Sequence, residues 1–171
     1  EQLGFYRERG LAPRRVGLRF QPDEKISLRS RQRTHAVPSR FGMTRQELLT
    51  AAELLSREPL DELGLYLQLS NNEAASGYLA AESRILLELL PEVEQRAGRR
   101  VDWCDIGGGL AVPDRKRPEI DLNREAELVH NAFRETGREK LSLHTQFGRF
   151  LAGPAGILLT RVQWTRTGQR N

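Results

Sequence analysis

The sequence predicts an α/β protein with a parallel sheet, and two observations support this prediction. Short apolar segments of strand length alternate with segments whose apolar residues recur at helical spacing, through most of the 171 residues. Such alternation builds right-handed βαβ units whose strands lie parallel in one sheet. Glycines and polar residues directly follow two of these strands, at 107–109 and 146–149, which is where parallel α/β proteins bind ligands.

The first strand is predicted at 15–20, where Arg-Val-Gly-Leu-Arg-Phe is followed by turn residues at 21–23. A polar, arginine-rich loop continues through Pro38. Thr44 and Glu47 then match a capping box, in which the threonine oxygen accepts from the amide of Glu47 and the glutamate reaches back. The apolar face of the helix that they begin consists of Leu48, Ala51, Ala52 and Leu55.

Two more helices and four more strands complete the pattern. The segment 63–69 is almost entirely apolar, as expected for a strand that is covered on both faces. A long helix is predicted from a cap at 70–73 to about Arg96, ended by Gly98, and the next strand runs from Val101 into the triple glycine. The remaining predicted elements are a helix at 123–135, a strand at 141–145 and an alternating strand at 156–164.

The composition is that of a soluble globular protein, with 38% hydrophobic and 29% charged residues. No apolar run is long enough to span a bilayer and the first residues lack a signal-peptide pattern, so a cytoplasmic location is expected. Cys104 is the only cysteine, which excludes an intrachain disulfide and predicts a buried, reduced thiol. His35, His130 and His144 are too scattered to predict a metal site.

The net charge of +4 raises the question of nucleic-acid binding. The densest basic run, 29–40, has no interleaved aromatic residues and matches no nucleic-acid-binding module. Elsewhere arginines alternate with glutamates, as on solvated helix faces. The sequence therefore does not favour a nucleic-acid partner.

The strand ends carry the strongest indication of a ligand. Gly107, Gly108 and Gly109 lack Cβ atoms, so their backbone can approach a phosphate closely and their amides can form an anion-binding nest. Arg149 can donate two hydrogen bonds to the same kind of group. The sequence predicts a phosphate cradle, while a tight turn without ligand and a salt bridge of Arg149 remain the alternatives.

Four segments, in this order and spacing, resemble the pyridoxal-phosphate decarboxylases of alanine-racemase fold, which include the diaminopimelate, ornithine and arginine decarboxylases. The segments are 16–19 (Val-Gly-Leu-Arg), 39–43 (Ser-Arg-Phe-Gly-Met), 105–109 (Asp-Ile-Gly-Gly-Gly) and 147–149 (Phe-Gly-Arg). The resemblance implies a partial TIM-type (β/α) barrel of about four βα units plus an exit strand. Residues 1–155 would be the later half of the barrel, and 156–171 the exit strand toward a missing β-rich C-terminal domain.

The resemblance also implies a cofactor, pyridoxal 5′-phosphate, and residues that bind it. Gly107, Gly108 and Gly109 would hold its phosphate, and Gly148 and Arg149 match the family's Glu-Pro-Gly-Arg segment, whose glycine amide also meets the phosphate. Ser70 is either a further phosphate ligand or only a helix N-cap. An amino-acid substrate and a homodimer are implied as well. Arg40 matches a basic position at the family's dimer interface, and the alternative is that it is a solvated loop arginine.

Three departures from the family pattern affect the chemistry. Gln146 replaces the glutamate that keeps the cofactor's ring nitrogen protonated, and Tyr66 and Gln68 replace histidines. None of the three lysines has the context of the Schiff-base lysine, so no residue is assigned a catalytic role. The expected function is a decarboxylase-like fragment that retains the phosphate cradle but is inactive alone. The alternative is a non-catalytic phosphate-ligand binding or regulatory module derived from that barrel.

Overall fold

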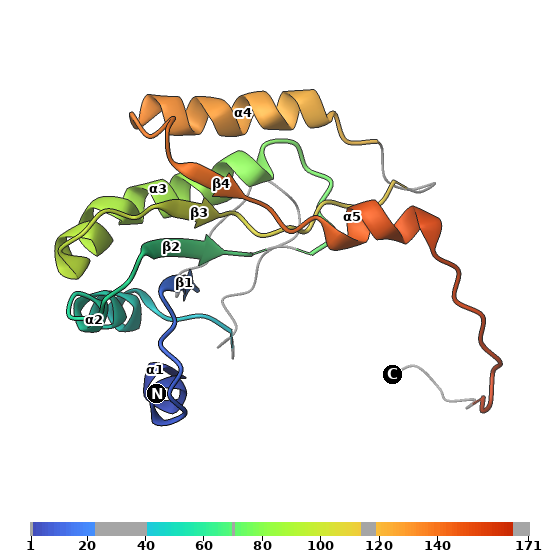
Figure 1. Ribbon diagram of the computed structural model, residues 1–171. Helices are drawn as coiled ribbons and strands as arrows, with labels where there is room; N and C mark the ends of the chain where they lie inside the picture. Colours follow the sequence, from blue (N-terminus) through green and yellow to red (C-terminus); the bar gives the residue numbers. More distant parts are fainter. Residues whose placement is uncertain (1, 23–40, 70, 114–118, 166–171) are drawn as a thin grey trace, which may run out of the picture.

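The computed structural model describes residues 2–22, 41–69, 71–113 and 119–165, and contains one parallel sheet of four strands. The strands follow the chain in the order β1-β2-β3-β4, and all are parallel (Figure 1). Their bounds are β1 (Arg15–Phe20), β2 (Glu62–Leu67), β3 (Trp103–Asp105) and β4 (Ser142–His144). The predicted parallel α/β arrangement is confirmed.

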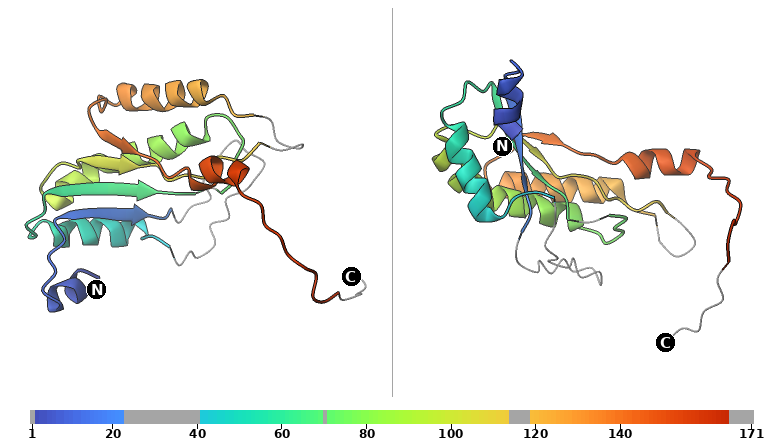
Figure 2. Two further views of the ribbon diagram at one scale, coloured as in Figure 1. Left: turned by 45° about the vertical axis from the view of Figure 1, so that its right-hand side comes forward. Right: turned by 90° about the horizontal axis from the view of Figure 1, so that it is seen from below.

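Three helices connect these strands and lie on one face of the sheet (Figure 2). They are α2 (Arg45–Leu55), α3 (Tyr78–Ala97) and α4 (Leu122–Glu135). A helix that the sequence did not predict, α1 (Gln2–Glu8), precedes β1, and another, α5 (Gly148–Ala152), follows β4 and continues into a 3-10 turn at Gly153–Ala155. None of the described helices combines the length and the apolar character needed to cross a bilayer.

The capping box of α2 is confirmed. The hydroxyl of Thr44 accepts from the amide of Glu47 at 3.3 Å, and the carboxylate of Glu47 accepts from the amide of Thr44 at 2.8 Å. The bond from the Thr44 amide, together with the Thr44 hydroxyl, lowers the pKa of the Glu47 carboxyl. The helix therefore begins at the residue that the sequence predicted, because its first amides have side-chain acceptors.

The helix α3 begins later than the predicted cap at 70–73. The backbone at Glu73 instead forms a bridge with Leu110, and the Glu73 carboxylate accepts from the amides of Ala74 and Ala75 at 2.9 and 2.8 Å. The helix starts after Gly77 and ends, as predicted, at Gly98, which has the left-handed φ of 63° that glycine tolerates.

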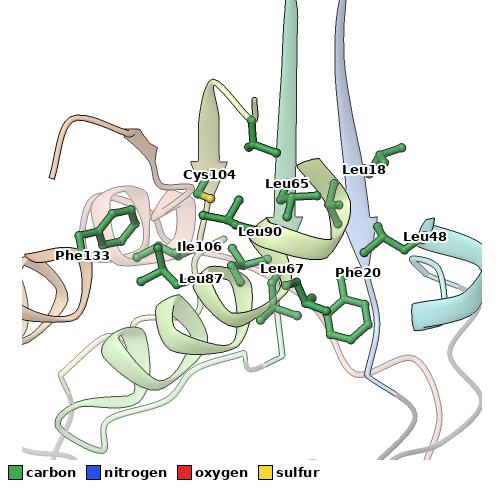
Figure 3. Packing of buried hydrophobic residues seen from close by; sticks show 14 of the residues in the cluster. Leu18, Phe20, Leu48, Leu65, Leu67, Leu87, Leu90, Cys104, Ile106 and Phe133 are labelled. Atoms are coloured by element: carbon green, nitrogen blue, oxygen red, sulfur yellow. The ribbon is translucent and has the colours of Figure 1, made fainter. Parts of the chain in front are cut away.

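The hydrophobic core lies between the sheet and its three helices (Figure 3). Leucines of the strands pack against leucines of the helices, and Leu65, Leu67, Leu86 and Leu90 are completely buried. Cys104 lies in the same cluster, unpaired, and burial raises the pKa of its thiol to about 12. The predicted buried, reduced thiol is confirmed.

The other face of the sheet is not covered by any described helix, although a strand covered on both faces was expected at 63–69. The indole of Trp103 lies across this face, over β2 and β1. An added Cβ would come within 2.1 Å of this ring at Gly64 and within 2.5 Å at Gly17. The imidazole of His144 stacks on the indole, with the ring centroids 5.2 Å apart. We call this surface the open face.

The predicted strand at 156–164 is wrong. Residues 156–165 form no strand or helix, and Ile157, Leu158 and Leu159 are about nine-tenths exposed. The chain leaves the sheet after α5 (Figure 1), so its backbone meets no described strand with which to pair. The alternating sequence favours a strand, but a strand also needs a hydrogen-bonding neighbour. An exit toward a β-rich domain stays a prediction.

Candidate functional site

The loops that follow β2, β3 and β4 meet at the carboxyl end of the sheet. The amide of Gln146, after β4, donates to the carbonyl of Gly107, after β3, at 2.6 Å. A Cβ added to Gly107 would lie 2.8 Å from the Cβ of Gln68, which follows β2. The predicted glycine loop and the predicted residue Gln146 are therefore brought together, as the parallel topology requires.

The triple glycine is held by all three of its carbonyl groups. The donors, in chain order, are the amide of Gln146 at 2.6 Å, the hydroxyl of Tyr78 at 3.1 Å and the amide of Glu73 at 2.6 Å. The amide of Gly107 donates to Asp105 Oδ1 at 2.7 Å. Within the described part of the chain, the amides of Gly108 and Gly109 have no acceptor. Two consecutive free amides in a loop whose carbonyls are tied elsewhere suit an anion.

Each glycine of this loop also has a structural requirement. Gly107 and Gly109 have φ values of 66° and 91°, which disfavour a side chain. A Cβ on Gly108 would lie 2.2 Å from the carbonyl oxygen of Gln146. Close packing at the strand ends therefore accounts for the glycines without a ligand, and this alternative stays open beside the phosphate cradle.

Gln146 is exposed, but its side chain is held in place. Its Nε2 donates to Asp105 Oδ2 at 2.6 Å, and the other oxygen of the same carboxylate accepts the amide of Gly107. One carboxylate thus joins the end of β4 to the first glycine of the loop. Asp105 was not among the predicted site residues, although its position directly before Ile-Gly-Gly-Gly was a signal for it.

Tyr66 and Gln68, the two residues in place of histidines, form a hydrogen-bonded row beside Gln146. The hydroxyl of Tyr66 donates to Gln68 Oε1 at 2.6 Å, and Gln68 Nε2 donates to Asn71 Oδ1 at 3.2 Å. The Arg19 guanidinium lies 4.8 Å from the centroid of the Tyr66 ring. Burial raises the pKa of the Tyr66 hydroxyl, and the charge of Arg19 opposes this effect. These contacts join polar side chains of β1 and β2 at the open face.

The structure does not place the remaining predicted site residues at the strand ends. The strand β4 ends at His144, so Gly148 is not at a strand end as predicted, but begins α5 with its amide donating to the carbonyl of Gln146 at 2.9 Å. Arg149 is exposed and forms no ion pair with any described residue. Ser70 and the basic run 29–40, with Arg40, lie outside the described residues.

Behind the triple glycine lies a buried polar layer that the sequence analysis missed. Tyr78 is 3% exposed, and burial raises the pKa of its hydroxyl, with three nearby glutamates adding to the effect. One of them, Glu125, accepts from the hydroxyl of Ser76 and the amide of Gly77 at 2.6 and 2.8 Å. The sequence places Tyr78 only within the predicted long helix, because the partner of its hydroxyl is 30 residues away in sequence.

The described residues do not supply an amine at this site. Lys140 is the only described lysine, and it lies before β4, at the amino end of the sheet. Lys25 and Lys116 fall outside the described residues. The described residues also contain no group of three or more potential metal ligands.

Comparison with known proteins gives a consistent set of relatives. Residues 6–153 match the family model of the pyridoxal-dependent decarboxylases, pyridoxal binding domain. The chain is 27% identical over 149 residues to protein TabA of Pseudomonas amygdali pv. tabaci, and 30% identical over 152 residues to the diaminopimelate decarboxylase of Streptomyces coelicolor. Each alignment covers 86% of this chain but only 35% and 33% of the relative. The chain thus spans about a third of the length of these proteins.

Solved structures agree on the fold. The diaminopimelate decarboxylase of M. jannaschii in complex with L-lysine superposes with a TM-score of 0.70 at 19% identity, covering 86% of this chain and 35% of that one. The lysine decarboxylase of Selenomonas ruminantium gives a TM-score of 0.67 at 19% identity, covering 88% and 37%. At this identity the likeness concerns the fold, which is that of part of a decarboxylase barrel.

Proposed function

Because this chain belongs to the pyridoxal-dependent decarboxylase family, in which it represents part of the pyridoxal-binding domain, we propose that it binds the phosphate of pyridoxal 5′-phosphate at the triple-glycine loop. The observation that carries this proposal is the pair of amides of Gly108 and Gly109, which have no acceptor in the described chain, in a loop whose three carbonyls are all hydrogen-bonded. These two amides would donate to the phosphate. Arg149, exposed and without a described ion pair, would add a charged donor.

The residues of the open face fit the rest of the cofactor only in part. When bound, the cofactor supplies an electron sink for decarboxylation of an amino acid. Gln146 would form a hydrogen bond at the ring nitrogen, but its neutral amide stabilises a positive ring less than the family's glutamate would. Gln68 and Tyr66 are hydrogen-bonded to each other at 2.6 Å. They would contact the edge of the cofactor ring, and neither supplies the imidazole of the family's histidines.

The proposed activity of the intact enzyme is decarboxylation of a basic or dicarboxylic amino acid, in the cytoplasm and as a homodimer. The described part of this chain has no lysine near the site. We therefore propose that this chain binds the cofactor without forming a Schiff base and does not catalyse the reaction alone. The joint change of Tyr66, Gln68 and Gln146 supports a second function, a non-catalytic module that binds or senses a phosphate ligand.

An absorbance and fluorescence titration of this chain with pyridoxal 5′-phosphate tests the proposal. We expect saturable binding that borohydride does not make covalent. Covalent attachment after reduction would mean that a lysine of this chain does reach the aldehyde, and no binding at all would overturn the cradle.

A matched pair of variants separates the cradle from general backbone strain. Gly109→Ala and Gly137→Ala both place a side chain at positive φ, 91° and 66°, but Gly137 lies at the end of α4, away from the site. We expect Gly109→Ala alone to weaken binding, by at least about tenfold, since one good charge-assisted hydrogen bond is worth about 1.5–3 kcal/mol. An equal loss of affinity for pyridoxal 5′-phosphate in both variants would indicate backbone strain rather than loss of the phosphate cradle.

A further inference from the structure

The Asp105 carboxylate fixes the orientation of the amide that faces the ligand. It accepts from Gln146 Nε2 at 2.6 Å and from the amide of Gly107 at 2.7 Å. A carboxylate only accepts hydrogen bonds, so the NH₂ end of Gln146, and not its carbonyl oxygen, must face Asp105.

Tyr66 lies beside Gln146, and this contact opposes the rise in the pKa of the Tyr66 hydroxyl. The hydroxyl proton of Tyr66 is already donated to Gln68 Oε1 at 2.6 Å, so the Tyr66 oxygen accepts at its contact with Gln146. The bond to Asp105 therefore directs the NH₂ group of Gln146 into the protein and leaves Oε1 as the polar atom that faces a ligand.

We propose that Asp105 is a positioning residue, which locks Gln146 so that its amide oxygen, a hydrogen-bond acceptor, faces the ligand and selects one whose ring nitrogen carries a proton. This inference rests on the proposed function, because it concerns the ring of the ligand whose phosphate the glycine loop would hold. A ring nitrogen without a proton would face Oε1 lone pair to lone pair and leave both atoms unpaired. Asp105 thereby stabilises the protonated ring nitrogen through Gln146, which a glutamate at position 146 would do directly and more strongly.

The charged groups around this pair come from the same row of the open face and from Glu82 of α3, whose charge raises the pKa of the Tyr66 hydroxyl. Arg19 on β1, Tyr66 on β2 and His144 on β4 stand in register with Asp105 on β3. Arg19 is directed to the ring of Tyr66 and His144 to the ring of Trp103, and neither forms an ion pair with Asp105 among the described residues. The orientation of the Gln146 amide accordingly depends on Asp105.

Pyridoxine 5′-phosphate is a suitable probe, because it has the ring and phosphate but no aldehyde, so its binding needs no lysine. Its absorbance reports the protonation of the ring nitrogen, and a pH titration of the complex gives the pKa of that nitrogen. We expect the bound ring nitrogen to hold its proton at least about tenfold more tightly than in free solution, which is about one pKa unit.

Three variants test the assignment. Asp105→Asn keeps an acceptor for the Gly107 amide but adds a donor that can turn the Gln146 amide around, so the gain in ring pKa should disappear. Gln146→Met removes the amide and leaves the Asp105–Gly107 bond, and should abolish the gain as well. The matched control Asp102→Asn changes a carboxylate before the start of β3, where Asp102 accepts the Leu63 amide at 2.8 Å, and should leave the gain intact.

The outcomes separate this inference from the proposed function. Binding with the same ring pKa in the unchanged chain, Asp105→Asn and Gln146→Met would overturn the positioning role alone. Failure of the unchanged chain and all variants to bind pyridoxine 5′-phosphate would overturn the proposed function and the inference with it. A gain that is lost in both site variants and kept in Asp102→Asn would establish Asp105 as the positioning residue.

Discussion

The two faces of the sheet differ in almost every respect. On the covered face, leucines from the strands meet leucines from α2 and α3, and several are completely buried. On the open face, two strands carry glycines beneath one indole, and the next row of side chains is polar. The covered face is filled by many interchangeable aliphatic groups, whereas the open face depends on a few specific residues. Stability is thus concentrated on one face and the candidate chemistry on the other.

Neighbouring residues of β2 allow the sharpest test of this difference, because Leu65 points to the covered face and Gly64 to the open face. Leu65 has no exposed surface, so Leu65→Ala should lower the free energy of unfolding by about 2–5 kcal/mol, through lost burial and the cavity left behind. Urea unfolding at pH 7 measures this value. A loss well below 1 kcal/mol would mean that the covered face does not dominate stability.

Gly64→Ala should cost less, about 1–3 kcal/mol, because the added methyl group would lie 2.1 Å from the Trp103 ring and must displace it. The double variant Gly64→Ala, Trp103→Val is the control. In the Trp103→Val background the same glycine substitution should cost almost nothing, since the indole is gone. An equal cost in both backgrounds would show that Gly64 is required for some reason other than the indole.

The smallest effect is expected at the capping box of α2, on the solvent side of the covering helices. The pKa of Glu47 is lowered from 4.5 in the folded chain by its bond to Thr44. A carboxyl group whose pKa is lowered on folding stabilises the fold at pH values above its pKa in the unfolded chain. This stabilisation is lost as the pH falls through the pKa of the folded chain. The stability difference between the unchanged chain and Glu47→Gln should therefore be present at pH 7 and shrink below about pH 4.5. A difference that grows on acidification would contradict this.

Sequence reasoning succeeded where local spacing decides the structure. The strand at 15–20, the capping box at Thr44 and the end of α3 at Gly98 all depend on residues within one or two turns of the chain. The resemblance to the decarboxylases was likewise carried by short motifs, and the family match confirms it.

It failed where the partner is distant or missing. The contact of Gln146 with Asp105 spans 41 residues, and that of Tyr78 with Gly108 spans 30, so neither partner is visible in a local pattern. The segment 156–164 has a strand-like sequence but no neighbouring strand among the described residues. The helix α5 was not predicted, because the family motif at Gly148 indicates a phosphate-binding amide and carries no local signal for a helix.

The position of Trp103 makes its intrinsic fluorescence a probe of the open face. The chain has two tryptophans, and the other, Trp164, is 92% exposed in the segment beyond α5. Replacing Trp164 by phenylalanine would leave one intrinsic fluorophore, half-buried over Gly17 and Gly64 and stacked with His144. Any molecule, domain or second chain that covers the open face must change the surroundings of this indole. Emission colour and quencher access would then report, without an added label, when this face of the sheet is occupied.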